Sequence, residues 1–393
     1  MNNSAGSKKI EKIFIGIWIL YLVAYVFSGT AALATEYPFV RTVYSTVANG
    51  TIIALCISLF CAKRYSLLNL FFYACFILLV FLIEVSAADR TLLVSIMFLL
   101  NVSNVDINKL IWINIKLKTD LLVVMLVLCA CGITKDTIYI IGGAQKHSMG
   151  TTNPNTLGMY MVSILIEWLC LHYGAIKKYQ YVVIIILCYI AHYITGARTS
   201  TYTFLVVFFL FILADCMPQI FNLRIVKVGL IMLTPAMAVF SFLLTRLYIN
   251  GNAAAIALNR LITGRLRYAA YALSRYQPKL IGQQIETIRN SDSTLMLDNA
   301  YIYGALAYGL LFMGGICLMY AVLFIRLLNY KQIGIALLGV FYVVSGLGEK
   351  YMYTVIFNIS LLYLLCRDEQ IETIKSENRF IRNKKFRVRI SGK

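Results

Sequence analysis

Long apolar runs recur along the whole chain and are separated by short polar segments. Most of these runs approach the roughly 20 residues that an α-helix needs to cross the hydrocarbon core of a bilayer. Inside that core every backbone N–H and C=O group must find its partner within the protein, which restricts an isolated apolar run to a helix. The pattern therefore predicts an all-α integral membrane protein with about 12 transmembrane helices. Residues 1–393 would form a single polytopic membrane domain.

The composition agrees with a membrane protein. Hydrophobic residues make up 60% of the chain and charged residues 13%, whereas soluble domains are about 45–50% apolar and about 25% charged. The formal net charge is +19, and much of it lies in short loops and after Cys366. This distribution follows the positive-inside rule rather than that of a nucleic-acid-binding protein. We therefore expect both termini and a basic tail, residues 367–393, in the cytoplasm, and no nucleic-acid partner.

The apolar runs and the basic clusters together predict the order and sides of the helices. The polar motifs described below are all predicted to lie on the membrane face opposite the basic clusters. The predicted helices cover, within a few residues, 13–33, 42–62, 67–86, 91–102, 109–132, 153–173, 179–195, 200–217, 226–247, 299–327, 333–347 and 353–366.

The longest polar interval, residues 247–298, is predicted to be a large extracytoplasmic loop. It holds Arg260, Arg265, Arg267 and Arg275 within one short stretch. A guanidinium group stays charged and donates two parallel hydrogen bonds to a phosphate. The cluster favours a site for a phosphate-bearing, lipid-linked substrate. A solvated amphipathic loop is the alternative.

Two further motifs interrupt apolar runs on the same predicted face. Arg198 lies in a Thr-Gly-Ala-Arg-Thr-Ser segment, and a charge at the bilayer centre costs about 2.5–3.5 kcal/mol on insertion scales. Arg198 is therefore expected either to bind an anion beside a helix N-terminus or to reach lipid headgroups. Asn153-Pro154-Asn155 is typical of a helix start, with Asn as the cap. Asn153 and Asn155 either cap that helix or bind sugar hydroxyls.

Two carboxylates are candidates for a general base. Asp298 sits where the polar loop re-enters the membrane, and it is either a helix N-cap or an acceptor of a proton from a sugar hydroxyl. Glu349 is followed by Lys350, and the two form either a surface ion pair or a second catalytic carboxylate with its neighbour. The sequence alone does not choose between Asp298 and Glu349.

Several kinds of site are missing from the sequence. We find no phosphate-binding glycine loop, no GxSxG, no HExxH and no paired acidic motif of a metal-dependent transferase in a predicted outer loop. The chain has three histidines, and its cysteines lie mostly inside apolar runs, where they are typical of packing residues. We expect no metal site and no cofactor.

In combination, four motifs resemble those of the O-antigen and capsular polysaccharide polymerase family (Wzy-type), which belongs to a superfamily with the O-antigen ligases. The resemblance covers about residues 150–350. The motifs are, in order, Gly150-Thr151-Thr152-Asn153-Pro154-Asn155 with Leu157-Gly158, Thr195-Gly196-Ala197-Arg198-Thr199, Thr263-Gly264-Arg265 with Arg267 and Gly282, and Asp298-Asn299-Ala300-Tyr301 with Tyr308-Gly309.

The resemblance implies a helical bundle similar to the GT-C-like glycosyltransferases, in the bacterial cytoplasmic (inner) membrane. The implied activity is metal-independent polymerisation of oligosaccharide repeat units carried on undecaprenyl pyrophosphate. The bilayer, a chain-length regulator and a flippase of the same pathway are implied partners. The family's arginines correspond to Arg198 and Arg265, and also to Arg260 and Arg267. Together with the residue-level interpretation above, the candidate catalytic residues are Asp298, Glu349, Arg198 and Arg265, and the candidate substrate-binding residues are Arg260, Arg267, Asn153, Asn155, Asn299 and Tyr301.

Two other functions stay open at this point. Ligases of the superfamily typically carry His at the position of Asp298, so the Asp in this chain favours a polymerase. A flippase or transporter would show charged residues in the middle of helices and internal pseudo-symmetry. The sugar, the linkage, the stereochemical outcome and the choice between capsule and O-antigen are not indicated by the sequence.

Overall fold

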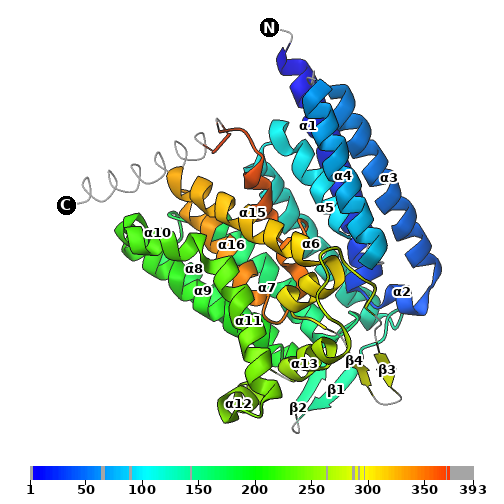
Figure 1. Ribbon diagram of the computed structural model, residues 1–393, viewed down its shortest axis with the longest axis vertical. Helices are drawn as coiled ribbons and strands as arrows, with labels where there is room; N and C mark the ends of the chain where they lie inside the picture. The colour runs from blue at the N-terminus through cyan, green and yellow to red at the C-terminus, as the bar shows by residue number, and fades with distance from the viewer. Residues whose placement is uncertain are drawn as a thin grey trace.

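A computed structural model describes residues 3–62, 67–87, 91–141, 144–262, 264–285, 288–290, 293–295, 297–368 and 370–371. Within these ranges the chain is predominantly helical, as predicted (Figure 1). Thr263, Arg64 and the basic tail from residue 372 onward lie outside the described residues.

Several described helices are long and apolar enough to cross a membrane. They are α1 (Asn3–Tyr25) continued by the π-helix η1 (Val26–Thr30), α3 (Phe39–Ala62), α7 (Pro154–Leu171), α8 (Lys178–Thr195), α9 (Arg198–Cys216) and α15 (Leu310–Asn329). The pair α10 (Arg224–Ile231) and α11 (Leu233–Ile249) is bent by 56° and brings the number from 6 to 7 if it forms one span. A chain of about 12 spans stays a prediction.

The other described helices are not among these candidate spans. They are α2 (Leu33–Glu36), α4 (Leu67–Ala87), α5 (Thr91–Asn101), α6 (Ile107–Ala130), α12 (Ala253–Leu261), α13 (Arg265–Arg275), α14 (Ala300–Tyr303) and α16 (Ile333–Ser345). Figure 1 shows α1, α3, α4 and α5 together on one side of the bundle and α8–α11 on the other. Between them, α16 packs on α7 and α9 and is buried along most of its length. An apolar helix of this kind belongs in the core.

Several of the predicted helices are not continuous α-helices, among them the one at 226–247, which is the bent pair α10–α11. The segment predicted as 299–327 contains α14, then the π-helix η4 (Gly304–Tyr308), and α15 begins after Gly309. Gly309 has φ 95°, and a Cβ there would lie 2.6 Å from the Leu280 carbonyl oxygen. The helix breaks at this glycine because the chain at residues 279–282 crosses it and takes hydrogen bonds from Leu310 and Leu311.

The prediction of an α-helix at 353–366 is wrong. This segment contains turns and the 3-10 helix η6 (Ile359–Leu364), and it is buried in the bundle. The Asn358 amide donates to the Met352 carbonyl at 2.8 Å and so replaces backbone hydrogen bonds of a regular helix. Side chains of this type compete with the helical ladder, which is the physical reason for the irregular backbone.

The predicted polar loop is largely ordered structure. It contains α12, α13 and the antiparallel hairpin β3 (Ile288–Asn290)–β4 (Ser293–Leu295), in which Ile288 pairs with Leu295. A second hairpin, β1 (Ile138–Ile141)–β2 (Ala144–His147), pairs Tyr139 with Lys146. Both hairpins, α12 and α13 gather at one end of the bundle, opposite the start of α1 (Figure 1).

Helix α13 is held at that end by an apolar stripe. Leu266, Ala269 and Ala272 are buried, and they recur at the three-residue spacing of one helix face. Ala269 and Ala272 join a small apolar cluster with Ile302 of α14 and Leu306 of η4. This packing fixes the position of Arg265, the first residue of the helix.

Candidate functional site

A cavity of about 520 Å³ lies at the end of the bundle that carries α13 and the β1–β2 hairpin. This volume is within the range of about 300–1,000 Å³ that is usual for ligand sites. The lining is contributed by Tyr25, Gly29, Thr91, Tyr139, Lys146, Thr152, Asn153, Pro154, Asn155, Thr156, Arg265, Tyr268, Asp298, Tyr303, Glu349, Lys350, Tyr351, Tyr353 and Thr354.

The lining is unusually hydrophilic. Among the described residues that line it are six tyrosines and four threonines, and none is Leu, Ile, Val, Met or Phe. Most small-molecule sites are lined predominantly by apolar side chains with only a few polar groups. This composition favours a ligand with many hydroxyl groups over a lipid tail or another apolar molecule.

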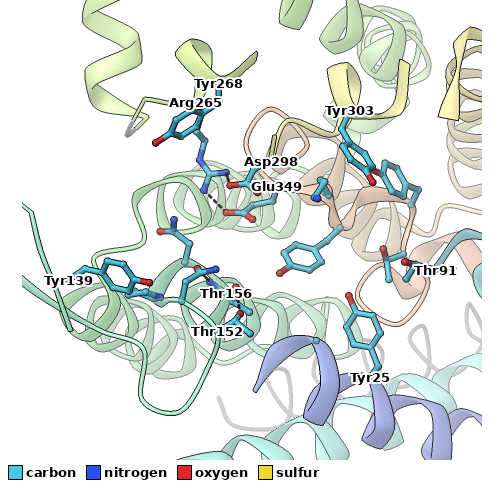
Figure 2. A pocket seen from close by; sticks show the side chains of 18 of the residues that line it. Tyr25, Thr91, Tyr139, Thr152, Thr156, Arg265, Tyr268, Asp298, Tyr303 and Glu349 are labelled. Atoms are coloured by element: carbon cyan, nitrogen blue, oxygen red, sulfur yellow. Dashed lines mark hydrogen bonds and ion pairs between the residues drawn. The ribbon is translucent and has the colours of Figure 1, made fainter. Parts of the chain in front are cut away.

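Arg265 forms the charged centre of the cavity. Its guanidinium donates to Asp298 Oδ2 at 3.0 Å and to Glu349 Oε1 at 2.8 Å, and its side chain is 5% exposed. Figure 2 shows the three side chains converging on one wall of the cavity, joined by these contacts. A buried charge needs such partners, because removing a charge from water costs several kcal/mol per ion.

The two carboxylates differ in their surroundings. Glu349 is buried, and burial raises the pKa of Glu349 to about 7, with the Arg265 charge opposing that rise and the Asp298 charge adding to it. Asp298 is more open, with 31% of its side chain exposed. The Asn299 side chain, rather than that of Asp298, caps α14 by accepting from Ile302 N at 3.0 Å. Asp298 is therefore left to pair with Arg265.

Of the two alternatives for Glu349 and Lys350, the surface ion pair is not formed. Glu349 points to Arg265 instead, and the Lys350 ammonium lies 4.3 Å from the centre of the Tyr303 ring. Gly348 makes this arrangement possible. A Cβ on Gly348 would lie 2.7 Å from the Thr199 methyl group and 3.1 Å from Arg265 Cδ. Arg265 and the Thr199 segment therefore meet at the same end of the bundle.

Lys146 also lines the cavity, and Arg198, which does not line it, lies near enough for its charge to act on the Lys146 ammonium. Lys146 is 7% exposed, and its ammonium donates to the Gly196 carbonyl at 3.2 Å. Burial and the nearby Arg198 charge lower the pKa of Lys146. Within the part of the chain that the structure describes, no carboxylate forms an ion pair with either cation. Two neighbouring cations with no carboxylate partner among the described residues favour an anionic ligand.

Gly196 places the Lys146 side chain. It is the left-handed C-cap of α8, with φ 57°, and its Cα lies under the Lys146 stem. A Cβ at this position would lie 2.7 Å from Lys146 Cε. The Gly-Ala-Arg sequence singled out above thus positions a lysine from a distant hairpin.

The two asparagines of the predicted motif both line the cavity. Asn153 also caps α7, because its side-chain oxygen accepts from Thr156 N at 2.9 Å. Its capping role and its exposure to the cavity are compatible, since the amide nitrogen is not used by the cap.

Five of the predicted residues do not line the cavity: Arg198, whose position is described above, and four others. Arg260 and Arg267 are exposed, and the Arg267 guanidinium lies 5.2 Å from the centre of the Tyr268 ring. Asn299 is buried and also donates to the Leu347 carbonyl at 3.1 Å. Tyr301 is buried and donates to the Val343 carbonyl at 2.6 Å. In these contacts Asn299 and Tyr301 hold α14 against the end of α16.

Sequence reasoning missed a buried ion pair inside the bundle. Lys118 of α6 lies 2.5 Å from Glu167 of α7, and both side chains are fully buried. Asn114 donates to the second Glu167 oxygen at 2.9 Å and accepts from Trp18 at 3.1 Å. The available signal was a lysine inside one predicted span and a glutamate inside another. Lys146 and the tyrosines of the cavity were not predicted either, because no motif distinguishes them from the many other lysines and tyrosines of the chain.

Comparisons with known proteins gave no match to any protein-family model, curated protein or solved structure. Within the described ranges, no group of three or more His, Cys, Asp or Glu side chains is placed to hold a metal ion.

Proposed function

We propose that the chain is a polysaccharide polymerase, which joins undecaprenyl-pyrophosphate-linked oligosaccharide repeat units into capsule or O-antigen chains at the outer face of the bacterial cytoplasmic membrane. One observation carries the proposal. A hydroxyl-rich cavity contains a buried carboxylate–guanidinium cluster and Lys146, with Arg198 nearby, and neither of these two cations has a carboxylate partner among the described residues. A glycan on a diphosphate offers both chemistries that this cavity favours.

The diphosphate of the donor would bind at Lys146 and Arg198. Arg265 is less suited to this task, because two of its guanidinium nitrogens already donate to Asp298 and Glu349. Charge-assisted hydrogen bonds to phosphate oxygens would also relieve the repulsion between Lys146 and Arg198. Arg265 would instead orient the two carboxylates toward the reacting hydroxyl.

In the proposed group transfer, the bonds formed and broken and the proton are all accounted for without a metal ion or cofactor. A hydroxyl oxygen of the acceptor sugar forms a bond to the anomeric carbon of the donor. The bond from that carbon to the diphosphate oxygen breaks, and its electron pair leaves on the diphosphate. The hydroxyl proton passes to Glu349, or to Asp298 in its place, and from there to water. Lys146 and Arg198 stabilise the negative charge that grows on the leaving diphosphate.

The proposal is tested by replacing the cations. In Arg198→Ala and Lys146→Ala, the rate of chain extension by purified protein on lipid-linked repeat units should fall about 10²–10³-fold, the usual loss of one positioned donor. Arg224→Ala, at an exposed arginine that starts α10, is the matched control and should keep its rate. Long chains formed at the wild-type rate by both cavity variants would exclude the proposal.

A ligase would use the same chemistry on a different acceptor. The two functions differ in what the Arg198→Ala cell accumulates. A polymerase variant leaves single repeat units on the lipid, whereas a ligase variant leaves long lipid-linked chains.

The buried Lys118–Glu167 pair favours a third function, transport of a lipid-linked unit. Ionisable residues inside a membrane bundle commonly mark transport pathways. Vesicles containing the purified protein distinguish the cases. Movement of lipid-linked repeat units across the vesicle membrane without chain extension would support transport and contradict the polymerase.

A further inference from the structure

The cavity has two chemically different ends. Figure 2 shows Tyr25, Thr91 and Tyr303 at one end and Tyr139 at the other, with Arg265, Asp298 and Glu349 on the wall between them. Lys146 belongs to the Tyr139 end, because the two residues are direct partners in the β1–β2 hairpin. The cation pair is therefore separated from Tyr25, Thr91 and Tyr303 by the Arg265 cluster.

The end without the cation pair consists of tyrosines and hydroxyl groups. It is lined by Tyr25, Thr91 and Tyr303, by Gly29 beside Tyr25, by Lys350 over the Tyr303 ring, by Tyr353, which contacts Tyr308 as Tyr303 does, and by Thr354, which follows Tyr353. Among these, Lys350 is the one charged residue, and its ammonium rests on the Tyr303 ring. Tyrosine offers an apolar face and a hydroxyl on one side chain. This combination suits a sugar ring, which has C–H-bearing faces and hydroxyls around its edge.

The backbone at this end has an uncommon conformation that presents two of the tyrosines. Tyr25 immediately precedes the π-helix η1, and Tyr303 immediately precedes the π-helix η4. These two segments are far apart in the sequence, yet each places a tyrosine in the same cavity. Single π-helical turns are rare and are frequent at functional sites.

We propose that this end, defined by Tyr25, Thr91, Tyr303, Tyr353 and Thr354, is the subsite for the acceptor sugar, an uncharged pyranose ring. The inference rests on the proposed function and adds which end of the cavity each substrate occupies. The donor diphosphate lies at Lys146 and the acceptor sugar at Tyr25 and Thr91. The acceptor hydroxyl then meets the anomeric carbon at Glu349, which neighbours Lys350 in the chain and lies on the wall between the two ends.

Binding is measured first, without turnover. Saturation-transfer NMR is recorded on the full-length protein in nanodiscs with four probes, the methyl pyranosides of glucose, galactose, rhamnose and N-acetylglucosamine. At least one probe should receive saturation from the wild-type protein. That signal should be lost in Tyr25→Leu, and it should persist in Arg198→Ala, because the probes carry no phosphate.

Tyr193→Leu is the matched control, since Tyr193 is a tyrosine on α8 that is 76% exposed and does not line the cavity. Thr91→Val keeps the side-chain shape and removes one hydroxyl, so it tests the subsite even if Tyr25→Leu fails to fold. The subsite is overturned if the wild-type protein transfers saturation to none of the four probes, or if folded Tyr25→Leu and Thr91→Val keep the wild-type signal.

Kinetics then separate the subsite from the proposed function. In Tyr25→Leu the acceptor concentration for half-maximal rate should rise more than about tenfold, and in Thr91→Val about 2- to 10-fold. The corresponding donor concentration should change little. An equal rise for donor and acceptor would overturn the assignment. A different result would separate the two proposals. If the wild-type protein binds a sugar, Tyr25→Leu does not, and the wild-type protein makes no polymer, the subsite is supported and the polymerase is refuted.

Discussion

Glu349 is the residue whose environment differs most from that expected of a loop carboxylate. The sequence places it next to Lys350 in a short polar break, which is typical of a solvent-exposed ion pair. In the structure it is buried beside Arg265 and Asp298. Its pKa is raised to about 7 by burial, so its protonation changes near neutral pH.

This pKa predicts a pH profile for the transfer. If ionised Glu349 accepts the hydroxyl proton, the rate at saturating substrate should rise about tenfold per pH unit below pH 7 and level off above it. Glu349→Gln should be slow and should lack this rise, because its amide keeps a hydrogen bond to Arg265 and cannot take a proton. The measurement is the initial rate from pH 5 to pH 9. A Glu349→Gln variant with the same rising limb as wild type would remove Glu349 from the mechanism.

The same pKa has a consequence for stability. An unfolded glutamate has a pKa near 4.3, so between about pH 4.3 and pH 7 the folded protein binds the Glu349 proton more tightly than the unfolded one. The free energy of unfolding should therefore fall as pH rises through this window, by up to about 1.4 kcal/mol per pH unit. Thermal unfolding in detergent should show a steeper loss in wild type than in Glu349→Gln. Equal slopes would mean that Glu349 is not buried in the folded protein.

At the scale of elements, the turn between α8 and α9 positions Lys146 of the β1–β2 hairpin as well as Arg198. Gly196→Ala would introduce a Cβ that overlaps the Lys146 stem and would strain a backbone at φ 57°. The donor concentration for half-maximal rate should rise, because Lys146 must leave its position. Gly174→Ala is the matched control, since Gly174 has φ 78° and an added Cβ would meet nothing within 4 Å. Equal effects of the two substitutions would show that backbone strain alone is responsible.

The ion pair between α6 and α7 packs, through Phe357, behind residues that line the cavity. The Lys118 ammonium lies 5.0 Å from the centre of the Phe357 ring, and Phe357 packs against Tyr351 and Tyr25, which line the cavity. In the Trp18–Asn114–Glu167–Lys118 chain the successive donor–acceptor distances are 3.1, 2.9 and 2.5 Å. Fully satisfied buried networks of this kind make packing specific.

A double-mutant cycle tests the role of this pair. Lys118→Met or Glu167→Met alone leaves an unpaired buried charge and should destabilise the protein by about 3–5 kcal/mol. The double variant should recover much of this loss, because neither charge is left unpaired. The measurement is thermal unfolding of the four proteins in one detergent. If the double variant loses as much stability as the two single variants combined, the pair does not act as a unit.

Sequence pattern predicted some elements and not others for physical reasons. Apolar length is a local property, so the helices Pro154–Leu171 and Lys178–Thr195 were expected close to their true bounds. The break at Gly309 and the irregular backbone at Asn358 depend on contacts with distant segments. No local pattern reports those contacts, and both segments were predicted as simple helices.

For the whole molecule, charge patterning predicted that Arg198, Arg265, Asp298 and Glu349 would gather at one end of the bundle, and in the structure they do. It did not predict which arginine would be neutralised by carboxylates. It also could not predict the tyrosine-rich wall, because the cavity is assembled from several segments across the chain. Ion pairing in the folded protein determines which charged side chains stay available to bind a ligand.

The orientation of the molecule in the membrane is the prediction on which the outer-face chemistry depends. Two native cysteines at opposite ends of the bundle are suited to test it: exposed Cys131 follows α6 at the end of the site, and exposed Cys216 ends α9 at the other. The positive-inside rule places Cys131 outside and Cys216 inside. A membrane-impermeant maleimide should therefore label Cys131 in spheroplasts, and Cys216 only after the membrane has been permeabilised. Cys131→Ser and Cys216→Ser identify each signal. Labelling in the reverse order would put the cavity in the cytoplasm, where a substrate delivered to the outer face could not reach it.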